Sequence, residues 1–148
     1  MLSKGQQLSD EHHVMRYVPS SRLRRDGDDN VVGFFAAAFE LRPEDDALSV
    51  NWVEYFSGDY PSQIELTVKS VRASKLKVGK NSAFGVAVVG SVKQLAQKSG
   101  KSIRVVFSPS DGNPSHTSIQ KLPREELVLF EALATEAFTE LVRNSDVP

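Results

Sequence analysis

The chain contains no cysteine. This absence excludes disulfide bridges, zinc sites with thiolate ligands, iron–sulfur clusters and cysteine nucleophiles. Its apolar runs are all shorter than the roughly 18–20 residues that cross a bilayer. The first residues, MLSKGQQLSDEHH, lack the apolar core of a secretory signal. We therefore expect a soluble, cytoplasmic protein.

Common nucleotide-binding and hydrolase motifs are also missing. Gly-Lys pairs begin at Gly79 and Gly100, but neither completes a phosphate-binding loop of the form GxxxxGK followed by Ser or Thr. No GxGxxG follows a predicted strand, and the GxSxG nucleophile elbow is absent. These absences disfavour nucleoside triphosphate hydrolysis and dinucleotide binding.

Metal-ligand spacings are equally scarce. The chain has no His-x-x-x-His pair, and its acid-rich segments at 26–30 and 44–46 do not complete a calcium-binding loop with a distal glutamate. We interpret both segments as solvated turns, and we expect neither a metal ion nor a cofactor.

The composition is that of one globular domain. Of the 148 residues, 40% are hydrophobic and 25% are charged, which is typical of globular proteins. A chain of this length buries about 70% of its unfolded surface, enough for one core. We expect a polar N-terminal tail at residues 1–10 and a single globular domain at residues 11–148.

Basic residues are concentrated in the middle of the chain. The formal net charge is −1, yet residues 62–104 contain nine basic side chains and one acidic one. If this segment forms one surface, it creates a local positive field; the alternative is that it faces the acidic ends of the same fold. We predict a small binding or accessory module whose basic face contacts an anionic partner, either an acidic protein surface or nucleic acid. The residues predicted to bind the anion are Lys69, Arg72, Lys75, Lys93, Lys98 and Lys101.

The hydrophobic pattern predicts an α+β fold. Strands are expected at residues 13–18, 31–41, 48–53, 83–89, 102–108 and 115–120, the last as a short edge strand beside the one before it. Helices are expected at residues 63–74, 90–97 and 123–143. We expect a mostly antiparallel or mixed sheet of about five to six strands with two or three helices on one face.

Two of these segments allow a second interpretation. Three alanines within residues 31–41 also permit a helix there. Residues 63–74 alternate at their start, which also permits a strand. The helix is favoured because Ser62 and Glu65 have the spacing of a capping box. In this motif the Ser side chain accepts a hydrogen bond from the backbone amide of the Glu, and the Glu side chain accepts one from the backbone amide of the Ser.

The C-terminal segment has the clearest helical pattern. Pro123 suits the first helical position, and Glu125 and Glu126 suit the positive end of the helix dipole. We predict a long amphipathic helix over residues 123–143 and expect its apolar face to be available for a homo-oligomer interface. That face consists of Leu127, Phe130, Ala134, Ala137 and Leu141.

Three histidines are the candidate acid–base groups, since imidazole titrates near neutral pH. On a strand, the adjacent His12 and His13 point to opposite faces, and Arg16 shares the face of His12. The alternative function is a small metal-independent enzyme acting on a phosphodiester or nucleotide. His116 and one of His12 or His13 would serve as acid and base, and Arg16 would hold the phosphate. In the simpler interpretation, His12 and His13 belong to a polar N-terminal stretch and His116 caps a turn.

Four aromatic residues cluster near a predicted turn: Trp52, Tyr55, Phe56 and Tyr60. They form either a surface for stacking or protein contact, or the closed end of the core. The other phenylalanines stand at core-like positions, so the sequence indicates no further stacking platform.

Overall fold

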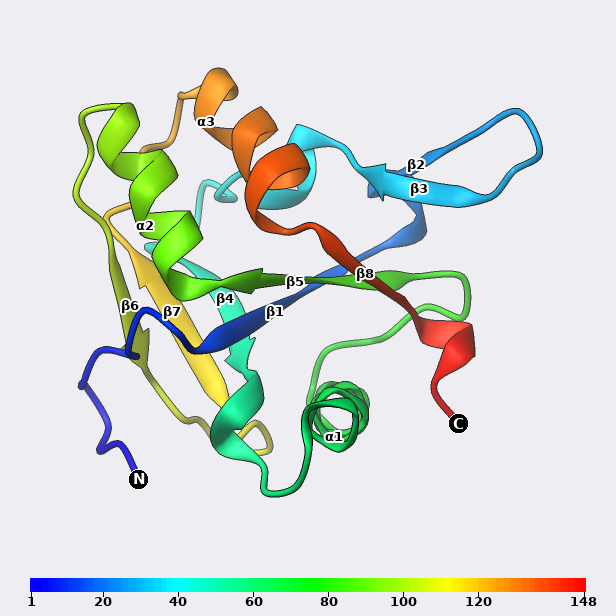
Figure 1. Cartoon of the computed structure of the whole chain (residues 1–148), viewed down its shortest axis with the longest axis horizontal. Helices are drawn as coiled ribbons and strands as arrows, with labels where there is room; N and C mark the ends of the chain where they lie inside the picture. The colour runs from blue at the N-terminus through cyan, green and yellow to red at the C-terminus, as the bar shows by residue number, and fades with distance from the viewer.

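The computed structural model describes all residues from 1 to 148 and is an α+β fold, as predicted. A six-stranded antiparallel sheet crosses the centre in the order β6-β7-β4-β1-β5-β8 (Figure 1). Its strands are β1 (His13–Val18), β4 (Ala47–Trp52), β5 (Ala83–Val88), β6 (Arg104–Phe107), β7 (His116–Gln120) and β8 (Glu140–Arg143). A separate hairpin joins β2 (Leu23–Arg25) and β3 (Val31–Phe34), and the helices are α1 (Tyr60–Ala73), α2 (Val89–Lys98) and α3 (Leu127–Ala132). None of these helices has the length and hydropathy to span a bilayer.

The helices lie on both faces of the sheet, which corrects the expected one-sided arrangement (Figure 1). α2 and α3 pack in one cluster with Val14 and Val18 of β1, whereas α1 packs in a second cluster with Met15. Successive residues of a strand point to opposite faces, so the two clusters lie on opposite sides of the sheet. β5 contributes to both, and five of its six residues are buried. Burial on both faces explains its unbroken apolar sequence.

The C-terminal segment is not the long helix that its spacing predicts. α3 is followed by one π-helical turn, Leu133–Ala137, and the chain then extends as β8. In β8, Leu141 and Val142 pair with Gly85 and Phe84 of β5. The edge of β5 offers backbone hydrogen bonds to an extended partner. This tertiary pairing overrides the local helical pattern beyond the π-helical turn.

Two aromatic side chains, from β3 and from the residues just before β8, approach the backbone of β5 closely at Gly85. A Cβ atom at Gly85 would lie 2.8 Å from the ring of Phe34 and 3.3 Å from Phe138. The ring of Phe39 lies 4.7 Å from that of Phe138 and 6.1 Å from that of Phe34. All three rings are buried, so the glycine lets aromatic side chains pack directly on the backbone of β5.

Three local predictions are also corrected. The expected strand at residues 31–41 divides into β3 and a 3-10 turn, Ala36–Phe39, because Phe39 turns back into the core. The helix expected at residues 63–74 is present but begins earlier, and its cap is Asp59, which accepts from the Ser62 amide at 2.9 Å. β7 pairs with β6 as expected, but it lies between β6 and β4 rather than at the edge.

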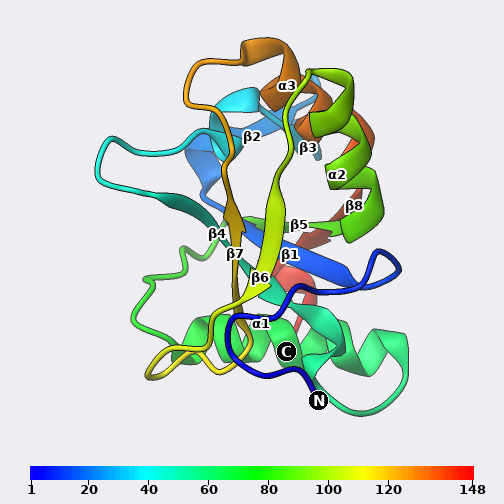
Figure 2. The ribbon, with the colours of Figure 1, turned by 90° about the vertical axis from the view of Figure 1, so that its left-hand side faces the viewer.

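The N-terminal segment lies along the outer edge of β6 (Figure 2). The amides of Gly5 and Leu8 donate to the carbonyls of Phe107 and Val105, and the Phe107 amide donates to Gln6, at 2.8–2.9 Å. Leu8 is buried. Within residues 1–10, expected as a polar tail, the chain therefore covers a sheet edge and adds one side chain to the core.

Candidate functional site

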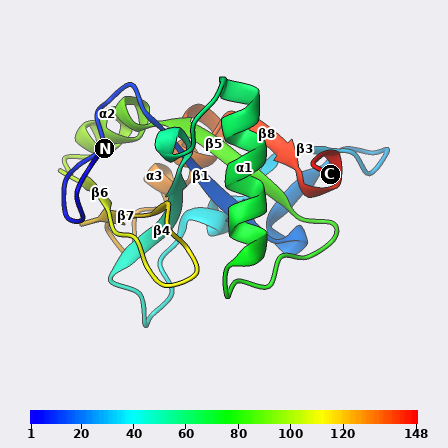
Figure 3. The same cartoon turned by 90° about the horizontal axis from the view of Figure 1, so that it is seen from below.

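A polar groove of about 440 Å³ opens on the face of the sheet that carries α1. Figure 3 views this face, where α1 runs beside β4 and β7 lies on the far side of β4. The groove is bounded by these strands, the end of α1 and the loop after it, and the turn between β6 and β7. The polar residues that line it include Arg16, Arg42, Asp45, Ser49, Asn51, Lys75, Asp111, Asn113 and His116.

Strand alternation makes the floor of the groove polar. Leu48 and Val50 of β4 are buried in the core, so Ser49 between them faces the groove. The neighbouring β7 places His116 on the same face, because the register pairs Asn51 with His116. The apolar side of α1 packs on β1 and β5, which leaves this polar part of the sheet accessible.

The hydrogen bonds of His116 determine which ring nitrogen carries the proton. Nδ1 lies 2.9 Å from the carbonyl oxygen of Ser108, an atom that only accepts. In the neutral ring the proton is therefore on Nδ1, and Nε2 keeps its lone pair. Nε2 lies 3.1 Å from Ser49 Oγ, so the serine hydroxyl donates to it. A hydroxyl, an imidazole and a group that orients the imidazole are thus arranged in series, an order that can activate a hydroxyl as a nucleophile.

A second contact steadies the His116 ring. The hydroxyl of Ser108 lies 2.9 Å from Nδ1 and 2.8 Å from the hydroxyl of Ser118. Ser108 therefore contacts the imidazole through both its carbonyl and its side chain. This network belongs to β7 and the end of β6, so the sheet itself holds the ring in place.

Arg16 occupies the position where β1 and β4 separate. The pairing of these strands ends at Met15 and Asn51. Arg16 Nε donates to the carbonyl of Ala38 at 3.1 Å, and Nη1 donates to the carbonyl of Ser49 at 2.8 Å. Burial lowers the pKa of Arg16 to about 10, so the guanidinium stays protonated at neutral pH. Its Nη2 has no hydrogen-bond partner within the protein, which leaves a donor beside the Ser49 backbone.

Buried Asn51 fixes the turn that forms one wall of the groove. Its Nδ2 donates to Oδ1 of Asn113 at 2.6 Å and to Oγ of Ser115 at 2.8 Å. These bonds tie the turn at residues 109–114 to the centre of β4. The turn is therefore fixed both by hydrogen bonds from β4 and by the conformational preferences of its own Pro and Gly residues.

The charges of the groove are only partly paired. Arg42 donates to Asp45 through Nε at 2.8 Å and Nη2 at 3.0 Å. These bonds lower the pKa of Asp45 and raise that of Arg42. Lys75 and Asp111 are exposed and form no ion pair. The cations that remain open to a ligand are therefore Arg16 and Lys75.

Only two of the four predicted catalytic residues meet in this groove. Arg16 and His116 line it, whereas His12 and His13 do not. The amide of His13 donates to Glu54 at 2.7 Å, and its Nδ1 lies 2.5 Å from the same carboxylate. The ring of His12 packs on Trp52 with 5.3 Å between ring centres. The groove therefore brings Arg16 and His116 together without a second histidine.

The sheet divides the predicted basic face. Lys69 and Arg72 lie on α1 and Lys75 follows it, whereas the other three predicted residues lie on α2 or just after it, across the sheet (Figure 2). Arg72 donates hydrogen bonds to Asn144, Val147 and Pro148 and so anchors the C-terminus. Ion pairs join Lys69 to Glu65, Lys93 to Asp10 and Lys101 to Glu126, and Lys98 is exposed.

Sequence reasoning missed Ser49 and Asn51. The alternation in residues 48–53 does place both on the face of the strand opposite Leu48 and Val50. Polar residues at such positions are ordinary on a half-exposed sheet. Their significance comes from the pairing of β4 with β7, which brings His116 beside them.

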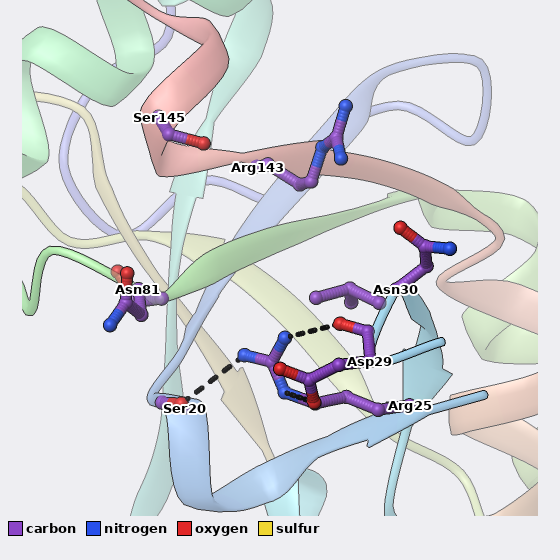
Figure 4. A pocket seen from close by; sticks show the side chains of 9 residues that line it. Ser20, Arg25, Asp29, Asn30, Asn81, Arg143 and Ser145 are labelled. Atoms are coloured by element: carbon purple, nitrogen blue, oxygen red, sulfur yellow. Dashed lines mark hydrogen bonds and ion pairs between the residues drawn. The ribbon is translucent and has the colours of Figure 1, made fainter. Parts of the chain in front are cut away.

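A second polar pocket, of about 420 Å³, lies between the β2–β3 hairpin and the C-terminal segment (Figure 4). Arg25 donates to Ser20 Oγ at 3.3 Å and to the Asp29 carbonyl at 3.1 Å. Arg143 donates to Asp146 at 2.9 Å. Both arginines are already engaged, so we place the candidate site in the groove that contains Ser49.

No group of three or more His, Asp or Glu side chains is arranged to hold a metal ion. Comparisons with family models, curated proteins and solved structures found no match for the chain. The functional assignment therefore rests on the geometry of the groove.

Proposed function

We propose that the groove is the active site of a small hydrolase in which Ser49, activated by His116, attacks an ester that carries a negative charge. The observation behind this proposal is the orientation of His116. The Ser108 carbonyl holds the proton on Nδ1, so the lone pair of Nε2 faces the exposed Ser49 hydroxyl at 3.1 Å. The proposed site thus keeps His116 and Arg16 from the enzyme that the sequence predicted, and it adds Ser49 as the nucleophile.

The reaction proceeds in two displacements. His116 Nε2 accepts the Ser49 proton while Oγ bonds to the electrophilic carbon or phosphorus of the ester. The alcohol leaves with the proton returned by the imidazolium. A water molecule then gives a proton to Nε2 and attacks the Ser49 adduct. The acid product departs, and the proton returns to Ser49 Oγ.

Arg16 and Lys75 support an anionic substrate. Arg16 is held beside the Ser49 backbone, and its Nη2 keeps free N–H donors. A fixed guanidinium at this position stabilises negative charge that develops on the oxygen of the attacked centre. Lys75 lies at the groove without a carboxylate partner, so it can attract a carboxylate or phosphate of the substrate.

The first test is covalent labelling, because it requires no knowledge of the substrate. A fluorophosphonate should form a phosphonyl adduct with loss of fluoride, and mass spectrometry should locate that adduct at Ser49. Ser49→Ala should abolish the label. Ser110→Ala is the matched control, since Ser110 lines the same groove but its hydroxyl contacts no imidazole. An unlabelled wild-type protein, or equal labelling of the Ser49→Ala variant, would refute the proposal.

Chromogenic substrates then test the charge of the ester. We expect p-nitrophenyl hemisuccinate or bis(p-nitrophenyl) phosphate to be hydrolysed with a lower KM than the uncharged p-nitrophenyl acetate. Lys75→Glu should raise the KM for the charged esters and leave that for the acetate unchanged. If only the acetate is hydrolysed, the proposal of Ser49 as the nucleophile still holds, but the proposal of a negatively charged substrate is wrong.

The loop after α1 supports a second candidate function, the binding of single-stranded nucleic acid. This proposal places the anion-binding site that the sequence predicted in one loop. Lys75, Lys77 and Lys80 are exposed, and none forms an ion pair. Three lysines in one loop can neutralise phosphates of a single-stranded nucleic acid and make binding salt-sensitive. We expect replacement of all three by Glu to abolish this binding and its salt dependence, as measured by fluorescence anisotropy with labelled RNA.

A matched control comes from the opposite side of the sheet. Replacement of Lys93, Lys98 and Lys101 by Glu changes the net charge as much as the triple variant of the loop does. It should therefore reproduce any loss of nucleic-acid binding that depends on net charge alone. Binding that weakens equally in both triple variants would contradict a local site in the loop. No binding by the wild-type protein at low salt would reject this function.

A further inference from the structure

An exposed apolar surface surrounds α3 and the β2–β3 hairpin. Of the eight exposed large hydrophobic residues in the chain, four belong to β3, the residue after it or the start of α3: Val32, Phe35, Leu127 and Val128. Their exposed fractions range from 50% to 77%. Monomeric proteins seldom leave such residues gathered at one place unless the surface contacts a partner.

Two adjoining depressions give this surface its shape. One, of about 740 Å³, is lined by Phe35 and Leu127, and the other, of about 340 Å³, is lined by Val32. They share Arg24 and Ala134 among their lining residues, so they lie next to each other. In Figure 1 the hairpin extends away from the six-stranded sheet, with the π-helical turn that follows α3 near its base. This surface lies on the side of the sheet opposite the Ser49 groove.

The charges around the larger depression are separated by sign. Arg22 and Arg24 come from the side of β2, whereas Glu40 and Glu131 come from the side of α3 and the preceding 3-10 turn. All four are exposed, and none takes part in an ion pair within the chain. The apolar depression therefore has one basic side and one acidic side, both unpaired.

We propose that a second copy of this chain covers this surface in a twofold-symmetric dimer. A twofold axis through the depression would bring the basic side of one copy against the acidic side of the other, twice. The exposed apolar residues would then meet at the centre and the ion pairs would form the rim, which is the usual order of a protein interface. The surface is complementary to itself, and this property selects a second copy over an unrelated protein.

Charge reversal tests the pairing directly. Arg24→Glu and Glu131→Arg should each place like charges across the interface and raise the dimer dissociation constant about 100-fold. Mixing the two single variants should restore dimers, because each then supplies the charge that the other lacks. The double variant should also dimerise by itself. Light scattering and sedimentation velocity distinguish the dimer from the 16.3 kDa chain.

An apolar pair of variants supplies the matched control. Leu127→Asp should dissociate the dimer, whereas Leu66→Asp, on the exposed side of α1, should leave it intact. Circular dichroism establishes that every variant is folded. A wild-type protein that stays monomeric at high concentration would overturn the proposal. Dimers that survive Leu127→Asp, or single charge variants that fail to associate on mixing, would do the same.

Discussion

Replacing His116 with Asn is expected to slow phosphonylation of Ser49 by about 100- to 10,000-fold, the usual contribution of a positioned general base. The Asn amide can still donate toward the Ser108 carbonyl, which the imidazole Nδ1 contacts at 2.9 Å. It offers no basic nitrogen at 3.1 Å from Ser49 Oγ. The variant therefore removes the base and keeps a polar side chain on β7.

A second histidine variant separates a general base in the groove from a histidine elsewhere in the fold. At one fixed pH, labelling of the wild-type protein should be fast and labelling of the His116→Asn variant slow, because only His116 Nε2 lies beside Ser49 Oγ. His13→Asn is the control, because His13 is bonded to Glu54 away from the groove. Equal labelling rates in wild type and His116→Asn would show that Ser49 does not depend on this histidine.

Replacing Phe138 with Ala is expected to lower the free energy of unfolding by about 3–5 kcal/mol, as for other buried aromatic residues. Phe138 is 1% exposed and its ring packs 4.7 Å from that of Phe39. The cavity has few atoms to fill it, because the neighbouring Gly85 has no side chain. For a chain of this size, each kcal/mol shifts the melting temperature by about 2–4 °C, so a fall of roughly 10 °C is expected.

The neighbouring Thr139 provides the control for this measurement. Thr139 is exposed and precedes β8, so Thr139→Ala should change stability by no more than about 0.5 kcal/mol. Urea unfolding followed by circular dichroism gives both values. A loss below about 1 kcal/mol for Phe138→Ala would contradict the close packing between the π-helical turn and β5.

The central elements of the fold could be predicted because their patterns are local. β1, β4 and β5 and helices α1 and α2 lie close to their expected positions. Alternation at period two or apolar spacing near 3.6 residues is written within each of these segments. Gly100 also occupies a left-handed conformation just after α2, with φ of 73°, as expected for a residue that ends a helix.

The C-terminal segment shows where such local patterns stop being sufficient. The spacing of Leu127, Phe130, Ala134 and Ala137 is helical, and these residues do lie in α3 and the π-helical turn. Leu141 continues the spacing but belongs to β8. The difference arises because β5 has an open edge at this point, and backbone hydrogen bonds to that edge compete with helix propagation.

The candidate site depends still more on tertiary structure. The sequence by itself determined the α+β class, the absence of cysteine chemistry and the residue types available for catalysis, because composition and short-range periodicity are properties of the chain. Only the fold decided that β7 lies beside β4, so that His116 meets Ser49 while His12 and His13 stay apart from it. It also decided that the basic segment is divided by the sheet. The physical reason is that strand pairing and helix packing join residues distant in the chain, and no local pattern specifies which edges and faces will meet.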